Sequence, residues 1–155
     1  MRILLKLVLD CTPDAAWDAI RSPATFARVS APFTVFESLE PDGFPERWSA
    51  GEHPVRVRAF GVVPIGTQSI AISFPHRDDG VRMMRDDGGG IDGPLAAVTE
   101  WHHTMAVSEA PGGRTLYRDR LQFRAGALTL ALWPMYWVFW QWRAVQMRRL
   151  ATTWR

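Results

Sequence analysis

Large apolar side chains recur every three or four residues near the C-terminal end of the chain. This spacing places them on one face of a helix. We expect the helix to run from about Pro134 to Trp154, with Pro134 in its first turn, where a missing backbone N–H is tolerated. The predicted face consists of Trp133, Trp137, Trp140, Ala144, Met147, Ala151 and Trp154. The pattern therefore predicts a long amphipathic helix that buries this stripe.

The same helix carries a second set of apolar side chains on another face, namely Met135, Val138, Phe139, Trp142 and Val145. A helix that is apolar on two sides must be covered on both. Loops of the same chain, a second subunit and a membrane surface are the possible covers. The sequence alone does not distinguish them.

The N-terminal segment has a strand pattern and then two helix start signals. Alternate positions from Ile3 to Leu9 are leucine or isoleucine, which predicts a strand with one buried face. Thr12 and Ser22 each precede a proline. Serine and threonine cap the first turn of a helix, and proline fits its first position. We therefore predict two short helices, at 13–20 and 23–30.

Seven strand-like segments follow, separated by turns that contain glycine, proline and aspartate. They span residues 33–40, 45–51, 55–62, 66–74, 80–87, 97–107 and 114–123. The glycine-rich segment 86–94 is expected to be a mobile loop. A strand, two short helices, several antiparallel strands and a long final helix indicate the α+β class, with the stripe of the final helix packed on the concave sheet.

This element order resembles the helix-grip fold of the SRPBCC superfamily, which includes START, Bet v 1-like and polyketide cyclase/dehydrase proteins. The opening "TPDAAWDAI" is similar to the usual first helix, and "GPLAAVTEWHHTM", "TLYRDRLQF" and "VFWQWRAVQMRRL" are similar to the end of bacterial members. Those members carry a Gly-Pro-aromatic turn, and here Leu95 replaces the aromatic residue. The resemblance implies a curved antiparallel sheet of about six to seven strands wrapped around the C-terminal helix, in one domain over residues 1–155. It does not select a reaction, because one fold supports many functions.

Composition is ordinary for one globular domain. The chain has 155 residues, 47% hydrophobic and 22% charged, with a formal net charge of +2. Its one cysteine, Cys11, excludes an internal disulfide. No apolar run reaches the length of a membrane span, and the first residues lack the cleavage site of a signal peptide. We expect a cytoplasmic protein without a cofactor.

Arginines dominate the last part of the chain. Eight arginines and one acid lie between Arg114 and Arg155. With interleaved tryptophans, such a pattern is compatible with nucleic acid or an anionic membrane. However, the strand arginines are expected opposite Glu100 and Asp86, and a solvated cross-strand ladder accounts for them. We therefore expect no nucleic-acid partner.

Two adjacent histidines lie on one predicted strand. Successive side chains of a strand point to opposite faces, so His102 and His103 cannot both bind one metal ion. The remaining histidines and the single cysteine add no metal-ligand spacing, so we expect no metal site. His103 shares its face with Trp101 and Met105, and it is therefore expected inside. It is either a core histidine with one nitrogen bonded or a ligand or acid–base group.

A carboxylate is also expected to point inward. Tyr117 and Asp119 share a strand face with Leu121 and Phe123. A buried carboxylate must be paired or have a raised pKa, so Asp119 is a candidate for function. It is equally well explained as a structural carboxylate. If a hairpin pairs this strand with that of His103, a base and an acid would flank an enolisable substrate.

These features favour binding of a hydrophobic small molecule, such as a lipid, a polyketide-like aromatic or a quinone, in an internal cavity without catalysis. The predicted ligand contacts are Trp48, Trp101, His103, Met105, Tyr117, Asp119, Trp137 and Trp140. One alternative is a cyclase/dehydratase-type enzyme that uses the same polar side chains. Another is an interaction protein whose tryptophan-rich helix contacts a partner, a membrane surface or a second copy of the chain.

Overall fold

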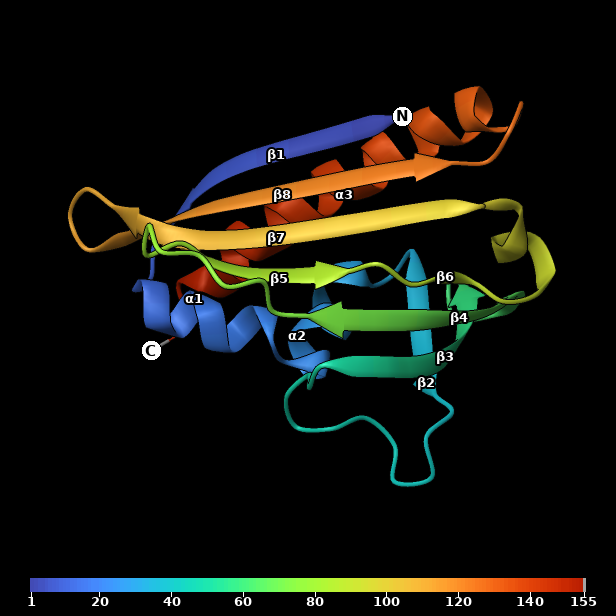
Figure 1. Ribbon diagram of the computed structural model, residues 1–155, viewed down its shortest axis with the longest axis horizontal. Coiled ribbons are helices and arrows are strands. Elements are labelled where there is room, and N and C mark those ends of the chain that lie inside the picture. The colour runs from blue at the N-terminus through green and yellow to red at the C-terminus, as the bar shows by residue number, and fades with distance from the viewer. Residues whose placement is uncertain (155) are drawn as a thin grey trace.

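A computed structural model describes residues 1–154, which form a curved sheet, a long C-terminal helix and two short helices (Figure 1). In chain order the elements are β1 (Arg2–Leu9), α1 (Pro13–Ile20), α2 (Pro23–Ser30), β2 (Thr34–Ser38), β3 (Gly51–Ala59), β4 (Val63–Ser73), β5 (Arg82–Asp86), β6 (Gly89–Gly90), the 3-10 helix η1 (Gly93–Ala97), β7 (Glu100–Ala110), β8 (Arg114–Arg124) and α3 (Thr129–Ala151). The predicted α+β class and helix-grip arrangement are confirmed.

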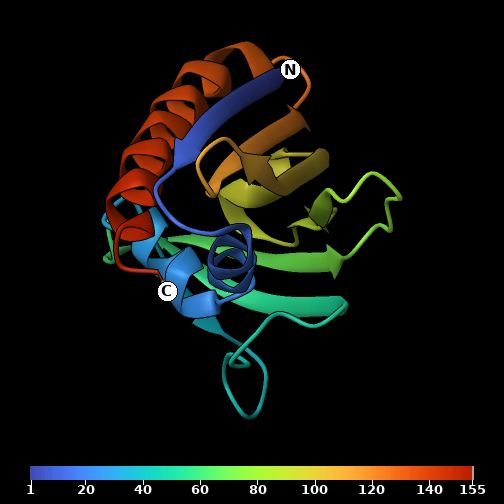
Figure 2. The ribbon, with the colours of Figure 1, turned by 90° about the vertical axis from the view of Figure 1, so that its left-hand side faces the viewer.

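The main sheet has the strand order β1-β8-β7-β5-β4-β3-β2, and β6 pairs with β4 away from this path. The named strands pair antiparallel. Figures 1 and 2 show that α3 runs along the sheet and that α1 and α2 lie near the C-terminal end of α3. Strands β7 and β8 form the predicted hairpin, in which Ala110 lies opposite Arg114. The apolar core lies between the sheet and α3.

The two short helices begin and end where the sequence predicts. The hydroxyl of Thr12 accepts a hydrogen bond from the backbone N–H of Ala15 at 3.3 Å. The hydroxyl of Ser22 accepts a hydrogen bond from the backbone N–H of Thr25 at 3.5 Å. Each cap satisfies a donor that has no partner inside the helix. The resulting helices cover one end of the core.

Residues 45–50 form no strand and β3 begins only at Gly51, so the strand predicted at 45–51 around Trp48 is wrong. Trp48 lies in the loop between β2 and β3, and its backbone N–H donates to the carbonyl oxygen of Arg21 at 2.7 Å. Its ring is buried against Phe26 and Phe44. A large aromatic ring anchors this loop by burial alone, without a neighbouring strand.

Helix α3 begins earlier and ends earlier than predicted. It starts at Thr129, so Pro134 lies inside the helix rather than in its first turn. The Thr129 hydroxyl accepts a hydrogen bond from the backbone N–H of Ala125 at 2.8 Å and donates to the carbonyl of Gly126 at 2.7 Å. These bonds fix an additional turn before the proline. No helix within residues 1–154 is both long enough and apolar enough to cross a lipid bilayer.

The predicted position of Trp137 is wrong. Its side chain is 45% exposed, whereas Trp140 is 2% exposed. A helix turns by about 100° per residue, so Trp137 lies about 60° around the axis from Trp140. Tyr136 lies about 40° away on the other side of Trp140 and packs in the core in its place. The buried face of α3 consists of Trp140, Arg143, Ala144, Met147 and Ala151.

Loops of the same chain cover part of the second apolar face of α3. The Trp142 indole donates to the backbone carbonyl of Ala31 at 2.7 Å. Phe33, in the turn between α2 and β2, contacts both Phe139 and Trp142. By contrast, Met135, Val138 and Val145 are exposed. A contact of this exposed part with a membrane or a second subunit stays a prediction.

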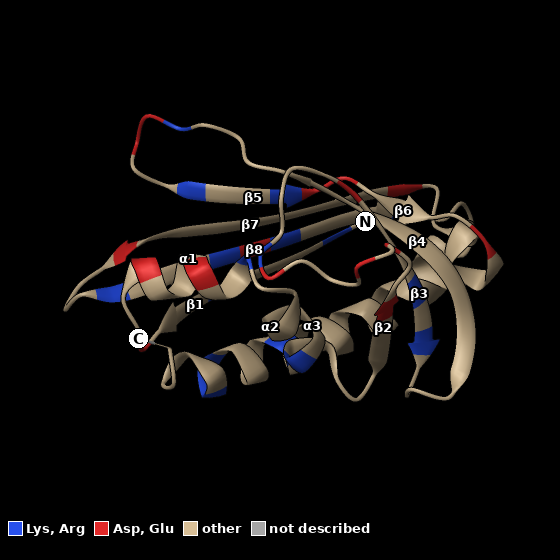
Figure 3. Cartoon of the chain, turned by 90° about the horizontal axis from the view of Figure 1, so that it is seen from below, with Lys and Arg blue, Asp and Glu red and all other residues tan. Residues whose placement is uncertain are grey.

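The strand arginines lie on the outer face of the sheet, as the ladder interpretation requires. Arg124 pairs with Glu100 at 3.3 Å, and Arg118 donates to the hydroxyl of Ser108 at 3.1 Å. Figure 3 shows basic and acidic segments interspersed along the elements rather than one continuous basic face. Arg155, which entered the count of arginines, lies outside the described residues.

Candidate functional site

A cavity of about 570 Å³ lies between the sheet and α3. Its wall is mainly aromatic and aliphatic, with contributions from α2, β2, β3, β4, β5, β6, η1, β7 and α3. The polar groups in the wall are Ser30, Thr34, Gln68, Asp86, His103 and Arg143. The wall reaches solvent at Phe60, Met135 and Val138, which are all exposed. The protein therefore has an apolar internal space with an opening beside the N-terminal half of α3.

A second cavity of about 30 Å³ lies deeper in the core. Trp48, Met105 and Tyr117 line it together with His103 and Arg143. This space is too small for a drug-sized ligand. His103 and Arg143 line both cavities and therefore lie at the boundary between them.

A buried carboxylate, that of Asp119, is held by side chains from three elements. Its Oδ1 atom lies 2.9 Å from Nε2 of His103 on β7 and accepts a hydrogen bond from the Trp140 indole of α3 at 2.8 Å. Its Oδ2 atom accepts one from the Tyr117 hydroxyl at 2.8 Å. An ionised carboxylate only accepts, so Nε2 of His103 carries the proton of that contact. The cluster joins β7, β8 and α3.

The hydrogen bonds of this cluster favour the charged form of Asp119. Burial alone raises its pKa, but neighbouring His103 and Arg143 and the bond from Trp140 outweigh burial and lower the pKa to about 2. Burial and the adjacent carboxylate raise the pKa of Tyr117 well above its usual value. Asp119 is therefore ionised and Tyr117 is a neutral hydrogen-bond donor at neutral pH.

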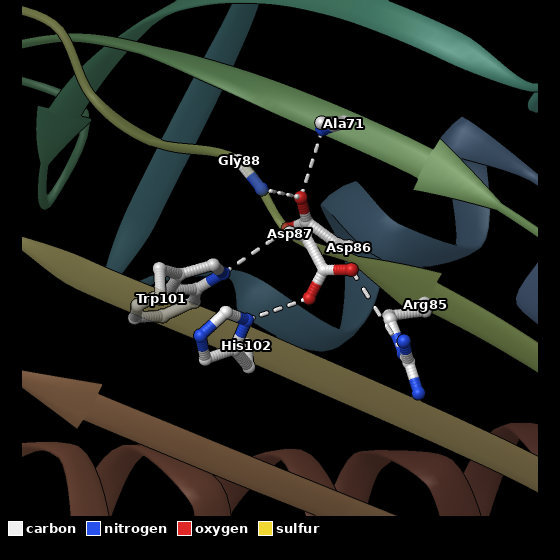
Figure 4. A network of polar contacts seen from close by, with 7 residues as sticks. All are labelled: Ala71, Arg85, Asp86, Asp87, Gly88, Trp101 and His102. Carbon is white, nitrogen blue, oxygen red and sulfur yellow. Dashed lines mark hydrogen bonds and ion pairs between the residues drawn. The ribbon is translucent and has the colours of Figure 1, made fainter.

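Asp86 is a second buried carboxylate, which corrects its predicted place in the outer ladder. Its Oδ1 accepts from the backbone N–H groups of Ala71 at 2.9 Å and Gly88 at 3.0 Å, and its Oδ2 accepts from the Trp101 indole at 3.2 Å (Figure 4). Burial raises the pKa of Asp86, although His103 and these hydrogen bonds oppose the shift. In the sequence "RMMRDD" the adjacent residues Met83 and Met84 are both apolar. The alternation of apolar and polar residues therefore did not show which face of this strand points inward.

The next residue, Asp87, points away from the cavity. Its carboxylate lies 2.7 Å from Nδ1 of His102 and 3.8 Å from Nε of Arg85 (Figure 4). All three side chains are partly exposed. The outward direction of His102 agrees with the strand alternation predicted from the sequence.

The glycine-rich segment after β5 forms part of the cavity wall and is tightly packed. A Cβ atom on Gly88 would lie 1.9 Å from the carbonyl oxygen of Ser69, and one on Gly90 would lie 2.1 Å from that of Leu95. Residues Gly89 and Gly90 also pair with β4 as strand β6. The glycines permit a close backbone approach here, so the segment is not the loose loop that its composition predicted.

The sequence interpretation counted Arg143 among the eight arginines of the C-terminal part but gave it no role of its own. The side chain is 5% exposed and projects from the buried face of α3. Its Nη1 donates to the hydroxyl of Ser30 at 3.2 Å, and its guanidinium carbon lies 5.2 Å from the Trp140 ring centroid. The sequence spacing indicates this buried position, because Arg143 lies three residues after Trp140 and four before Met147 and so shares their helix face.

The predicted ligand contacts divide into three groups. Trp101, His103 and Trp140 line the large cavity. Trp48, Met105 and Tyr117 line only the small one. Asp119 and Trp137 line neither: Asp119 lies behind the wall, bonded to His103, Tyr117 and Trp140, and Trp137 is on the surface.

Comparison with known proteins gives relatives by structure only. No family model matches the chain, and no curated protein matches it in sequence. Among solved structures, the Zhui aromatase/cyclase of a Streptomyces species superposes with a TM-score of 0.64 at 13% identity, covering 98% of this chain and 93% of that chain. The fold is shared.

Two further structures have no stated activity. A Chromobacterium violaceum protein superposes with a TM-score of 0.64 at 16% identity, covering 97% of this chain and 96% of its own. A hypothetical protein of Helicobacter pylori superposes with a TM-score of 0.69 at 10% identity, covering 97% of this chain and 88% of its own. At such identities the comparisons establish the fold alone.

Proposed function

We propose that the protein is a member of the SRPBCC superfamily that binds a hydrophobic small molecule, for carriage or sensing, in the cavity beneath α3. The observation that carries this proposal is the cavity itself. Its volume of about 570 Å³ falls within the range of small-molecule pockets, and its wall is mostly apolar with a few polar groups. A lipid, a polyketide-like aromatic and a quinone are the ligand classes that suit such a wall.

The aromatic wall supports this proposal energetically. Phe33 contacts Phe60 at the opening and Phe139 on α3, at ring-centroid distances of 5.8 and 6.0 Å. Transfer of apolar ligand surface into such a space is favoured by about 25 cal/mol per Å². Phe60 and Met135 are exposed at the opening, so a ligand would contact apolar side chains as it enters.

Native mass spectrometry of freshly purified protein tests the proposal. We expect a co-purified adduct of lipid size, and a higher melting temperature after addition of a long-chain or aromatic ligand. Ala59→Trp is the matched variant, because Ala59 lines the cavity and is only partly buried. It should lose the adduct and remain folded. No adduct and no thermal shift with fatty acids, aromatic polyketides and quinones would contradict the proposal.

A second candidate is a cyclase/dehydratase-type enzyme, favoured by one observation. His103 lines the cavity while its Nε2 is bonded to the buried Asp119, so Nδ1 is the nitrogen left to accept a proton. In a dehydration, Nδ1 of His103 would remove the α-proton of a β-hydroxyketone and return that proton to the hydroxyl, which leaves as water as the C–O bond breaks and the enone forms. The enone absorbs ultraviolet light, which gives a direct assay. His103→Gln should lower the rate about 100- to 10,000-fold; an unchanged rate would exclude this role.

A further inference from the structure

The inference that follows rests on the proposed binding of a hydrophobic molecule and specifies the chemistry of that molecule. We propose that the ligand carries a carboxylate, which pairs with the guanidinium group of Arg143 inside the large cavity. The ligand would then be an apolar acid whose hydrocarbon part occupies the aromatic cavity.

Arg143 is a buried cation that lies near enough to Asp119 to lower the pKa of that carboxyl, but it makes no direct contact with a carboxylate in the described chain. No ion pair within 4.0 Å joins it to any acid of residues 1–154. Its Nη1 donates to Ser30, but its buried Nε has no hydrogen-bond partner among these residues. A guanidinium group has five N–H donors, and a buried donor without an acceptor is costly. The side chain therefore has donors to offer to a ligand.

The guanidinium group is held in place by aromatic rings. Its carbon lies 5.2 Å from the ring centroid of Trp140, 5.9 Å from that of Phe139 and 6.0 Å from that of Phe26. Ring faces attract cations and keep the planar group oriented. These three residues also line the large cavity. Arg143 thus presents its donors from a fixed position, which reduces the entropic cost of binding an anion.

The other charged groups around the cavity already have their own hydrogen bonds. Asp119 accepts from three side chains, and Asp86 accepts from two backbone amides and Trp101. Burial raises the pKa of Asp86, so its neutral form is more accessible when an anion binds nearby. His103 donates to Asp119 through Nε2. Arg143 is consequently the cation best placed to receive a ligand anion.

A carboxylate fits this site better than a phosphate. Two parallel N–H donors of one guanidinium match the two oxygens of one carboxylate. A phosphate monoester carries nearly two negative charges at neutral pH. Among residues 1–154, the guanidinium of Arg143 is the only one that lines the cavity, and Asp86 lines the same wall. The second charge of a phosphate would therefore be buried without a partner, which is unfavourable.

Isothermal titration calorimetry with decanoate, 1-decanol and decyl phosphate tests the inference, since the three probes share one hydrocarbon chain. At about pH 8 decanoate is fully ionised. Wild-type protein should bind decanoate about 10- to 100-fold more tightly than decanol, as expected for charge-assisted hydrogen bonds. Arg143→Met should bind the acid and the alcohol equally. Arg143→Lys, which retains the charge but loses the planar fork, should retain part of the preference.

Arg148→Met is the matched control, because Arg148 is an exposed arginine on the same helix. It should bind all three probes as the wild type does. Equal affinity for decanoate and decanol in the wild type would overturn the carboxylate inference and leave the binding function intact. Tighter binding of decyl phosphate than of decanoate, or an acid preference that survives in Arg143→Met, would also overturn it. Failure of all three probes to bind the wild type would count against both proposals.

Discussion

Replacing Asp119 with asparagine removes one charge from the core and retains the shape of the side chain. The asparagine oxygen can still accept from His103 and Trp140, which both bond to Oδ1 in the wild type. Its amide nitrogen then faces the hydroxyl of Tyr117, which bonds to Oδ2 in the wild type. Tyr117 must turn its proton away and accept instead. The substitution therefore tests the charge of Asp119 more than its packing.

The expected loss of stability follows from the pKa of this carboxyl. The pKa falls from 3.8 to about 2 in the folded protein. Each unit of such a shift corresponds to about 1.4 kcal/mol, so the folded state favours the charged form of Asp119 by about 2 kcal/mol. A weakened contact with Tyr117 adds about 1 kcal/mol. We expect Asp119→Asn to lower the free energy of unfolding by about 2–4 kcal/mol at neutral pH.

The contribution of Asp119 to the free energy of unfolding should decrease as the pH falls. Because the pKa of Asp119 is lower in the folded state, its contribution is fully present above the unfolded value of 3.8 and is lost as the pH falls toward about 2. Urea denaturation at several pH values should therefore show that the difference in stability between wild type and Asp119→Asn narrows below about pH 4. In Asp87→Asn, a matched change at a partly exposed acid, the loss should stay below about 0.5 kcal/mol. A loss for Asp119→Asn as small as that control, or a difference that is constant with pH, would refute the reasoning.

Two further substitution pairs test the packing. Trp140→Ala should destabilise the protein by about 3–5 kcal/mol in chemical denaturation, as expected for deletion of a buried aromatic. Trp137→Ala should cost less than about 1 kcal/mol, because Trp137 is 45% exposed. Equal losses would show that the helix faces are assigned wrongly. Gly90→Ala should lower the melting temperature, since its Cβ would lie 2.1 Å from the Leu95 carbonyl oxygen, while Gly89→Ala has no atom within 4 Å of its Cβ and should be nearly neutral. A tolerated Gly90→Ala would contradict the tight packing of this wall.

The fold was largely accessible from the sequence because its elements carry strong local signals. Thr12 and Ser22, each followed by proline, marked the starts of both short helices. Strict alternation marked β8, on which Tyr117 and Asp119 face inward. Both kinds of signal depend on neighbouring residues alone. Apart from the strand predicted at 45–51 and the short strand β6 inside the predicted loop, the order of elements was confirmed for the same reason.

The positions that were missed depend on contacts between distant segments. The ring of Trp48 is buried through a loop, which has no periodicity to reveal it. Asp86 is turned inward and bonded to amides of Ala71 and Gly88, and only the folded sheet brings these donors together. Trp137 and Tyr136 lie three and four residues before Trp140, and either spacing is compatible with the same helix face. The sequence pattern therefore did not show that Tyr136, rather than Trp137, packs in the core.

The location of Asp119 bears on the choice between binding and catalysis. The carboxylate lines neither cavity, and it acts on the cavity wall through the edges of His103 and Trp140, which it holds in fixed orientations. A carrier and an enzyme both need that rigidity, because a preorganised wall lowers the cost of binding and of proton transfer alike. The two functions therefore diverge at His103. A carrier needs only the surface of its ring, whereas an enzyme needs Nδ1 as a base, so substrate turnover rather than stability separates them.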